Sequence, residues 1–173
     1  MRYWWVTANL HNPRFQWHWR EFFEKPFDAI WGRGKITERA ALCHIAEMDK
    51  WDIIVAYQAK ECLVHGLACL RRGGFRNRPS RASREDSFEV AARPFVPLIR
   101  PVPLSRIQSL PAADDIEFIH KHMGSVFDIG EQGFNGIVRR MIRMNPDQEE
   151  EIRSFISWVK AKASGSVEAV AVG

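Results

Sequence analysis

Arginine is concentrated in one stretch of this chain, and its chemistry suits phosphate groups. Residues 71–84 hold six arginines and no acidic residue: Arg71, Arg72, Arg76, Arg78, Arg81 and Arg84. The planar guanidinium matches phosphate geometry, so this stretch predicts contacts with a phosphate backbone, and such contacts weaken as salt rises. A solvated linker is the alternative explanation of the same residues.

Tryptophan is the second unusual feature, with seven residues in a chain of 173. A predicted helix over residues 13–25 has an apolar stripe centred near Trp19, and Trp17 falls almost opposite that stripe. Trp31 lies beside Gly32 in the stretch Ile30-Trp31-Gly32-Arg33-Gly34, where backbone and ligand can approach closely. Each could instead pack under a neighbouring element or anchor a loop. Aromatic surfaces close to arginine are typical of sites that stack single bases.

The motifs of common enzyme classes are absent: there is no nucleophile elbow, phosphate-binding loop, dinucleotide-binding loop or zinc-protease helix. Cys62, His65 and Cys69 have a spacing that resembles a metal cluster. On a strand, however, residues 62 and 65 point to opposite faces unless a bulge intervenes. Cys43-His44 and His120-Lys121-His122 also diverge on a helix. We therefore expect no catalytic site, no metal and no other cofactor.

Composition favours one packed domain, because 46% of the 173 residues are apolar. No apolar run approaches the roughly 18 residues of a membrane span. The N-terminal residues 1–6 lead directly into a strand-like pattern, so a secretory signal is not expected. Three cysteines cannot form a complete disulfide framework, which favours a cytoplasmic protein. The net charge of +4 arises in the arginine-rich stretch, which alone contributes +6.

The hydrophobic pattern predicts an α+β fold. Strands are expected over residues 3–8, 52–58, 62–70 and 87–104; the second and third form a hairpin, and prolines make the last an edge or bulged strand. Helices are expected over residues 13–25, 38–48, 105–110, 114–122, 134–144 and 146–162. Residues 27–36 and 71–84 are predicted as loops. Because few helices separate consecutive strands, a small mixed β-barrel with helical insertions and C-terminal helices fits better than a doubly wound sheet.

Several segments, taken in order, resemble an EVE domain of the PUA-like superfamily, which also holds the YTH readers of methylated adenine. They are Tyr3-Trp4-Trp5-Val6, Asn12-Pro13, Ile30-Trp31-Gly32, Trp51 to Gln58, Val64 to Ala68, Phe95 to Leu98 with Pro101 to Leu104, and Gln132-Gly133-Phe134. The resemblance covers roughly residues 3–144. Two positions depart from it: the family usually has glycine at the position of Trp51 and serine at that of Ala59.

The resemblance implies a PUA-like domain over residues 1–145, with 71–85 as an arginine-rich insertion, 146–162 as a C-terminal helix and 163–173 as a flexible tail. It also implies a five- or six-stranded barrel whose pocket, beside the first strand, accepts a flipped, modified base. Carried over by position, the pocket residues would be Asn9, Trp31, Gly32, Tyr57, Gln58, Gln132 and Gly133. The helix argument adds Trp17 to this set.

The leading hypothesis is a non-catalytic module that binds DNA or RNA carrying a modified base, with no membrane partner. Trp31, together with either Trp17 or Trp5, would sandwich the base, and the six arginines would hold the backbone. The amides of Asn9, Gln58 and Gln132 suit its Watson–Crick edge, because an amide both donates and accepts. One alternative is a protein-interaction or regulatory accessory module that uses the C-terminal helix. A nucleic-acid-processing enzyme is the third, and the missing acid–base pair disfavours it.

Overall fold

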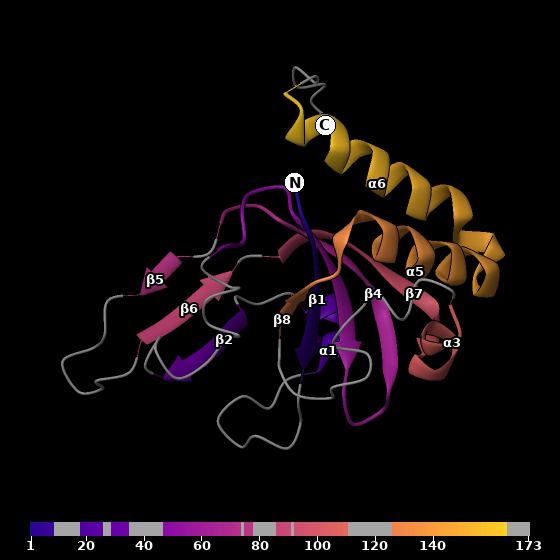
Figure 1. Cartoon of the computed structure of the whole chain (residues 1–173), viewed down its shortest axis with the longest axis horizontal. Helices are drawn as coiled ribbons and strands as arrows, with labels where there is room; N and C mark the ends of the chain where they lie inside the picture. The colour runs from indigo at the N-terminus through magenta and orange to yellow at the C-terminus, as the bar shows by residue number, and fades with distance from the viewer. Residues whose placement is uncertain are drawn as a thin grey trace.

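The computed structural model describes residues 1–8, 18–25, 29–34, 47–73, 75–77, 86–90, 92–110 and 126–165 (Figure 1). For residues 29–34, 75–77 and 86–90 only the backbone is described. Most of the helix predicted over 38–48, all of the helix predicted over 114–122 and the tail beyond Gly165 lie outside these residues.

The described strands form two sheets. The larger sheet contains, in spatial order, β7 (Ala92–Pro103), β4 (Leu63–Leu70), β3 (Ile53–Gln58), β1 (Tyr3–Ala8) and β8 (Val126–Asp128). The smaller contains β2 (Ala29–Gly34), β6 (Asp86–Val90) and β5 (Phe75–Asn77). The helices are α1 (Trp19–Glu24), α3 (Leu104–Gln108), α5 (Gly130–Met144) and α6 (Glu149–Ala163), with a 3₁₀ turn η2 (Pro146–Gln148) before α6. None of the helices within the described ranges is long and apolar enough to cross a membrane.

The α+β class and the β3–β4 hairpin are confirmed, while a closed barrel is not. β3 and β4 follow one another and pair antiparallel, whereas β1 and β3 pair parallel, which makes the larger sheet mixed. Among the described strands this sheet ends at β7 and β8, and the two edges do not pair. β8 was not predicted, because three residues are too few to show an alternating pattern.

Two segments predicted as loops contain strands instead. Residues 29–34 form β2, and residues 75–77, within the arginine-rich stretch, form β5. Both pair antiparallel with β6, so cross-strand hydrogen bonds outweigh the weak strand propensity of glycine-rich and arginine-rich sequence. The single strand expected over 87–104 is correspondingly two strands, β6 and β7, which belong to different sheets.

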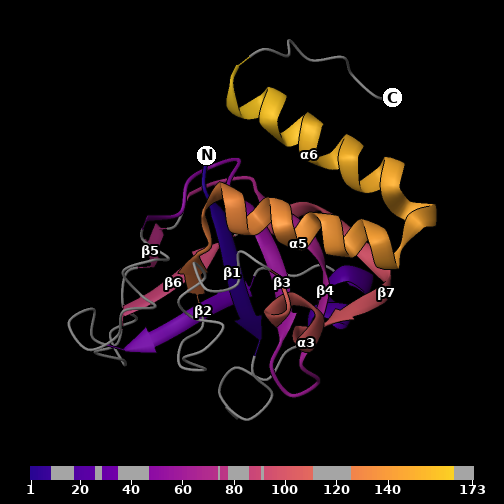
Figure 2. The same cartoon turned by 45° about the vertical axis from the view of Figure 1, so that its right-hand side comes forward.

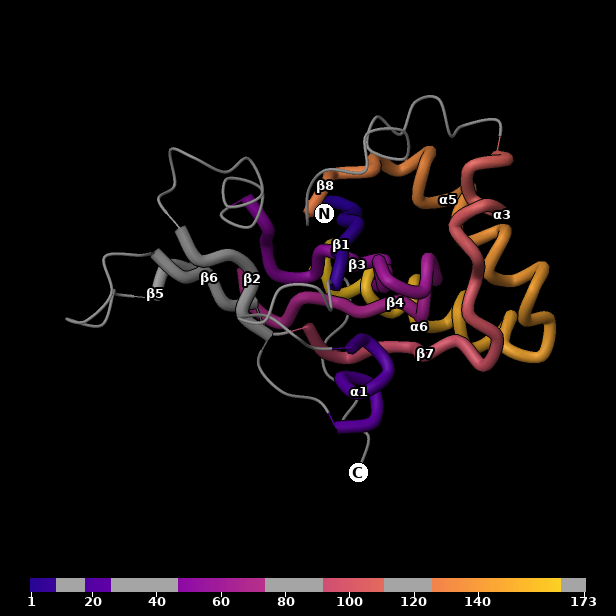
Figure 3. Tube along the Cα trace, turned by 90° about the horizontal axis from the view of Figure 1, so that it is seen from below, coloured from indigo at the N-terminus to yellow at the C-terminus, as the bar shows by residue number. Residues whose placement is uncertain are grey.

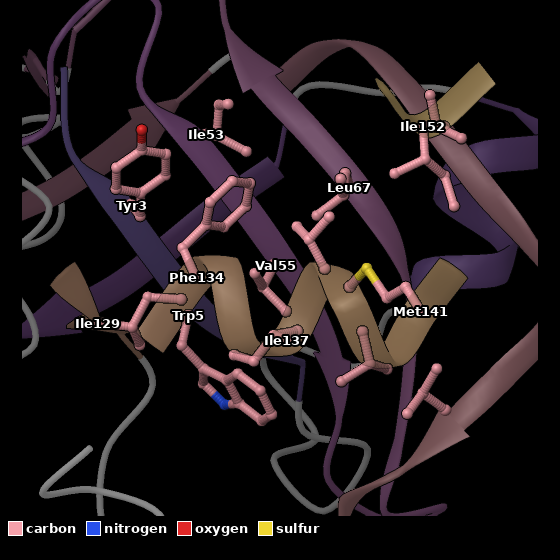
Figure 4. Packing of buried hydrophobic residues seen from close by; sticks show 14 of the residues in the cluster. Tyr3, Trp5, Ile53, Val55, Leu67, Ile129, Phe134, Ile137, Met141 and Ile152 are labelled. Atoms are coloured by element: carbon pink, nitrogen blue, oxygen red, sulfur yellow. The ribbon is translucent and has the colours of Figure 1, made fainter. Parts of the chain in front are cut away.

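Helices cover both faces of the larger sheet (Figures 2 and 3). On one face α5, α6 and α3 pack on the odd-numbered residues of β1 and β3, and Figure 4 shows Tyr3, Trp5 and Val55 beside Phe134 and Ile137 of α5. On the other face α1 packs on the even-numbered residues through Trp19, Phe22 and Phe23. Double coverage explains why all six residues of β3 are buried and why its sequence does not alternate.

The C-terminal helix α6 is part of this core. The predicted apolar stripe lies inward, with Ile152, Phe155 and Val159 buried in the same cluster as α5. Trp158 remains 39% exposed, and its ring meets the Trp51 ring edge-on, with 5.6 Å between the two ring centroids. The apolar face of α6 is therefore covered by the chain itself, while its opposite face remains exposed.

Two amide side chains from the α5–α6 connection form hydrogen bonds with the backbone of the edge strand β7. Asn145 accepts the Arg100 N–H at 2.8 Å and donates to the Arg100 carbonyl at 3.0 Å. Gln148 accepts the Ile99 N–H at 2.7 Å and donates to the Pro97 carbonyl at 3.0 Å. Both amides are buried, so they satisfy the backbone of β7 as a further strand would.

Asp52 fixes the parallel start of β1 and β3. Its buried carboxylate accepts the Arg2 N–H at 2.7 Å, the Trp4 indole N–H at 2.8 Å and the Asp49 N–H at 2.9 Å. The preceding residue, Trp51, has a φ of 73°, in the left-handed region that favours glycine. This backbone explains why a glycine suits the position before the aspartate, and Trp51 occupies it with a side chain packed on Trp158.

Candidate nucleic-acid interface

The smaller sheet brings an aromatic residue and an arginine from the predicted site into one row. Trp31 of β2 pairs with Phe88 of β6, and Phe88 pairs in turn with Arg76 of β5. Neighbouring strands lie about 4.8 Å apart, so the backbones at Trp31 and Arg76 are roughly 10 Å apart. The predicted base-stacking residue and a predicted phosphate ligand thus lie in one row of the sheet, on either side of Phe88, although 45 positions separate them in the sequence.

Gly32 occupies an irregularity in β2. The register of β2 against β6 shifts between Trp31 and Arg33, so Gly32 has no partner on β6. A bulge of this kind bends a strand and increases its twist locally. Glycine at the bulge leaves the backbone next to Trp31 without a side chain, which permits close approach of a ligand.

The structure describes three of the six arginines of the predicted phosphate-binding stretch. Arg71 and Arg72 are exposed in a bend directly after β4, and Arg76 lies in β5. Arg78, Arg81 and Arg84 lie outside the described residues, as do Asn9 and Trp17. The structure therefore places three of the predicted phosphate ligands along the chain segment that connects the two sheets.

Tyr57 and Gln58 lie on opposite faces of β3. Tyr57 is buried under α5 and its ring contacts Trp5 at 4.7 Å, and burial raises the pKa of its hydroxyl well above the usual value. Gln58 lies on the α1 face and is completely buried. Because their side chains project in opposite directions, they do not line one pocket together, contrary to the expectation from sequence.

The amide of Gln58 is occupied by the backbone around it. Its oxygen accepts the Trp19 N–H at 3.2 Å, and its nitrogen donates to the Ala8 carbonyl at 3.3 Å. The Trp19 indole N–H also donates to the Val6 carbonyl at 3.2 Å. Gln58 thus fastens the start of α1 to the end of β1, and its completely buried amide is hydrogen-bonded to this backbone through both its oxygen and its nitrogen.

Gln132 and Gly133 lie at the other end of β1. Ile129, which precedes α5, donates its N–H to the Tyr3 carbonyl at 2.9 Å, so the first turn of α5 begins beside the first residue of β1. Gln58 pairs with Ala8, five residues further along β1, a distance of roughly 17 Å. Gln132 is exposed and Gly133 is buried. The sequence-based pocket therefore combined residues from both ends of one strand.

A cluster that sequence reasoning missed lies beside Gln58. Glu61 lies in the β3–β4 turn, and its two carboxylate oxygens each accept one hydrogen bond at 2.8 Å, one from His18 Nε2 and the other from His65 Nε2. The two imidazoles meet edge-on at 4.9 Å. His65 reaches this face because β4 has an irregularity at His65 against both β3 and β7, which redirects its side chain. Only the Glu61-His65 spacing hinted at the cluster in the sequence.

The protonation of this cluster follows from its contacts. His18 Nδ1 accepts the Arg20 N–H at 2.9 Å as the N-cap of α1, so its proton is on Nε2 and is donated to Glu61. Burial lowers the pKa of His65 and outweighs the opposing hydrogen bond to Glu61. Burial alone would raise the pKa of Glu61, but the two histidine hydrogen bonds reverse this and lower it. The Glu61 carboxylate thus accepts a hydrogen bond from Nε2 of each histidine.

The ligand atoms of His18, Glu61 and His65 lie within 4.8 Å of one another, as a metal site would require. A metal on His18 Nε2 would place a proton on Nδ1, against the Arg20 N–H, and would break the helix cap. The hydrogen-bonded arrangement needs no metal. Neither cysteine of the Cys62-His65-Cys69 spacing belongs to this cluster: Cys62 is exposed, and burial raises the pKa of Cys69 to about 12.

No model of a known protein family matches this sequence, and no curated protein matches it. Solved structures share its fold. Protein Atu2648 from Agrobacterium tumefaciens has a TM-score of 0.62 and 16% identity, over 84% of this chain and 93% of that one. A hypothetical protein from Leishmania major has a TM-score of 0.59 and 19% identity, over 86% and 97%.

The human THYN1 protein, solved in complex with DNA containing 5-methylcytosine, has a TM-score of 0.60 and 12% identity, over 79% of this chain and 95% of that one. The DUF55 domain of human thymocyte nuclear protein 1 superimposes equally well, with a TM-score of 0.60. At these identities the likeness concerns the fold. These neighbours show that the chain shares its α+β fold with the DUF55 domain of human thymocyte nuclear protein 1.

Proposed function

We propose that this chain is a non-catalytic nucleic-acid-binding module that recognises a modified base. The observation that carries the proposal is the row Trp31–Phe88–Arg76 across the smaller sheet. A base needs a flat surface on which to stack, and its phosphate needs a cation nearby. Trp31 would supply the first and Arg76 the second.

The fold supports the same proposal. Human THYN1, which has this fold, was solved with DNA containing 5-methylcytosine. In this chain the bulge at Gly32 would let the backbone of β2 approach the base beside Trp31. Arg71 and Arg72, exposed after β4, would extend the phosphate contacts beyond Arg76.

Other predicted residues take supporting roles in the proposal. Gln58 holds α1 on β1 and does not contact the base, and Tyr57 belongs to the core under α5. Gln132, at the far end of β1, is not part of the pocket. Among the described residues, the proposal therefore rests on Trp31 for stacking and on Arg76, with Arg71 and Arg72, for phosphate contacts.

Fluorescence anisotropy with short labelled oligonucleotides tests the proposal. DNA and RNA probes carry either cytosine or 5-methylcytosine at the centre. Stacking is worth about 1–3 kcal/mol per base, so Trp31→Ala is expected to weaken binding by roughly 5- to 150-fold. Trp158→Ala is the matched control, because it removes a partly exposed tryptophan from α6. Equal affinities of the two variants would contradict the proposal.

The same assay separates backbone binding from base recognition. Arg76→Gln is expected to lower the affinity, and to reduce the slope of affinity against salt concentration by the equivalent of about one phosphate contact. Arg153→Gln on α6 is expected to leave both quantities unchanged. One buried methyl group contributes about 0.8 kcal/mol, so the wild type should prefer the methylated probe about fourfold if this is its base. Gel analysis of the same mixtures tests the absence of catalysis, since shortened strands or released base would overturn it.

A further inference from the structure

A second basic site lies in the corner between α3 and the end of α5. A hollow of about 400 Å³ is lined there by Arg106 of α3 and by Arg140, Arg143 and Met144 of α5. Arg140 and Arg143 are three residues apart and therefore neighbours on the helix surface. The packing of α3 against α5 adds Arg106 to this pair, so three guanidinium groups surround one hollow.

Among the residues that the structure describes, no negative charge balances the three arginines of this hollow. No described acidic residue lines the hollow, and none forms an ion pair with Arg106, Arg140 or Arg143. Within the described part of the chain, Arg140 Nε is buried without a hydrogen-bond partner, and Arg140 Nη2 donates to Ser109 Oγ at 3.5 Å. A guanidinium has five N–H donors, so the described residues accept from few of the donors of Arg140.

Ordinary structural roles do not account for this arrangement. The helix dipole stabilises Arg143 in the last turn of α5, and solvent accommodates Arg139 on the exposed face. Neither explains why Arg140 buries an unpaired Nε beside two further cations. Burying an unsatisfied polar group and gathering like charges are both unfavourable, and an anion in the hollow would relieve both.

We propose that Arg106, Arg140 and Arg143 bind a phosphate group. Arginine forks match the tetrahedral oxygens of phosphate, and the hollow is large enough for a phosphate or a pyrophosphate. Two sources share this chemistry: a free phosphate compound, or a backbone phosphate of nucleic acid. Figure 1 draws the smaller sheet and the α3–α5 corner on opposite sides of the molecule, so this site is separate from Trp31 and does not depend on the function proposed above.

Isothermal titration with inorganic pyrophosphate in phosphate-free, low-salt buffer tests the site. The lining variant Arg106→Gln/Arg143→Gln changes side chains at the surface and is expected to fold. Its matched control, Arg139→Gln/Arg153→Gln, removes the same charge from exposed positions outside the hollow. We expect one binding site in the wild type, at least tenfold weaker binding in the lining variant, and binding within twofold of wild type in the control.

Absence of saturable binding in the wild type, or equal weakening in both double variants, would overturn the proposal. An oligonucleotide titration of the same proteins identifies the source of the phosphate. A backbone phosphate predicts a lower salt slope in the lining variant, whereas a free phosphate compound predicts unchanged oligonucleotide affinity. Trp31→Ala should retain pyrophosphate binding, so failure of the base-recognition proposal and failure of this one give different results.

Discussion

Replacing Asp52 by asparagine should reveal how strongly one carboxylate holds the parallel strands β1 and β3 in register. Asp52 is 1% exposed, with one oxygen accepting the Arg2 N–H and the other accepting both the Trp4 indole N–H and the Asp49 N–H. An asparagine would place its remaining oxygen toward Trp4 and Asp49, because this keeps two of the three hydrogen bonds. Its NH₂ would then face the Arg2 N–H, leaving two donors opposed.

The expected loss follows from the number of broken bonds. A hydrogen bond to a charged acceptor is worth about 1.5–3 kcal/mol, so Asp52→Asn should lower the free energy of unfolding by about 2–3 kcal/mol. Asp52→Ala breaks all three bonds and should cost roughly 5 kcal/mol, a large part of the 5–15 kcal/mol that typically stabilises a domain. The ratio of the two losses is therefore about two.

Urea unfolding followed by tryptophan fluorescence measures both losses of unfolding free energy. Asp147→Asn is the control at an exposed position, and it should change the free energy of unfolding by less than about 0.5 kcal/mol, which is about the measurement error. An Asp52→Asn protein as stable as this control would refute the reasoning. So would equal losses for asparagine and alanine, because the argument depends on the number of donors that each variant leaves unpaired.

Three further predictions concern the larger sheet. A Cβ at Gly66 would lie 2.3 Å from the Val96 carbonyl oxygen, so Gly66→Ala should lower the free energy of unfolding by more than about 2 kcal/mol in urea unfolding. An unchanged free energy of unfolding would show that β4 and β7 can separate freely. Asn145→Ala should cost about 2–3 kcal/mol and raise light scattering, because edge strand β7 loses its amide cover; unchanged stability would contradict the role given to that amide. Stability should fall as the pH drops below about 6.5, because the pKa of His65 is lowered in the folded protein and the unfolded chain therefore binds a proton at His65 more readily. It should fall further near pH 4, where Glu61 becomes protonated. Urea midpoints measured over a pH series should lose the first decline in His65→Gln, and an unchanged pH profile in this variant would contradict the role given to His65.

The elements with strong periodic patterns could be predicted from the sequence. The hairpin β3–β4 and the helices α5 and α6 have apolar runs or stripes, and the structure contains each of them near the expected residues. The glycine-rich strand β2 could not be predicted in this way, because its pairing with β6 depends on a segment more than 50 residues away. Neither strand shows its partner in local sequence.

The candidate site was harder to predict than the fold. Tyr57 and Gln58 are adjacent in sequence, and alternation along β3 sends them to opposite faces. Conversely, Trp31 and Arg76 are distant in sequence and become neighbours only through Phe88. A regular strand would send Cys62 and His65 to opposite faces, and the bulge in β4 instead brings His65 to Glu61 and His18.

Nucleoside mass spectrometry of nucleic acid captured from cell extract tests the central claim most directly. The wild type is compared with Trp31→Ala and with the matched control Trp158→Ala. One modified nucleoside should be enriched by the wild type and by Trp158→Ala, and this enrichment should disappear with Trp31→Ala. Capture without enrichment of any modified nucleoside, or the same enrichment by all three proteins, would contradict it.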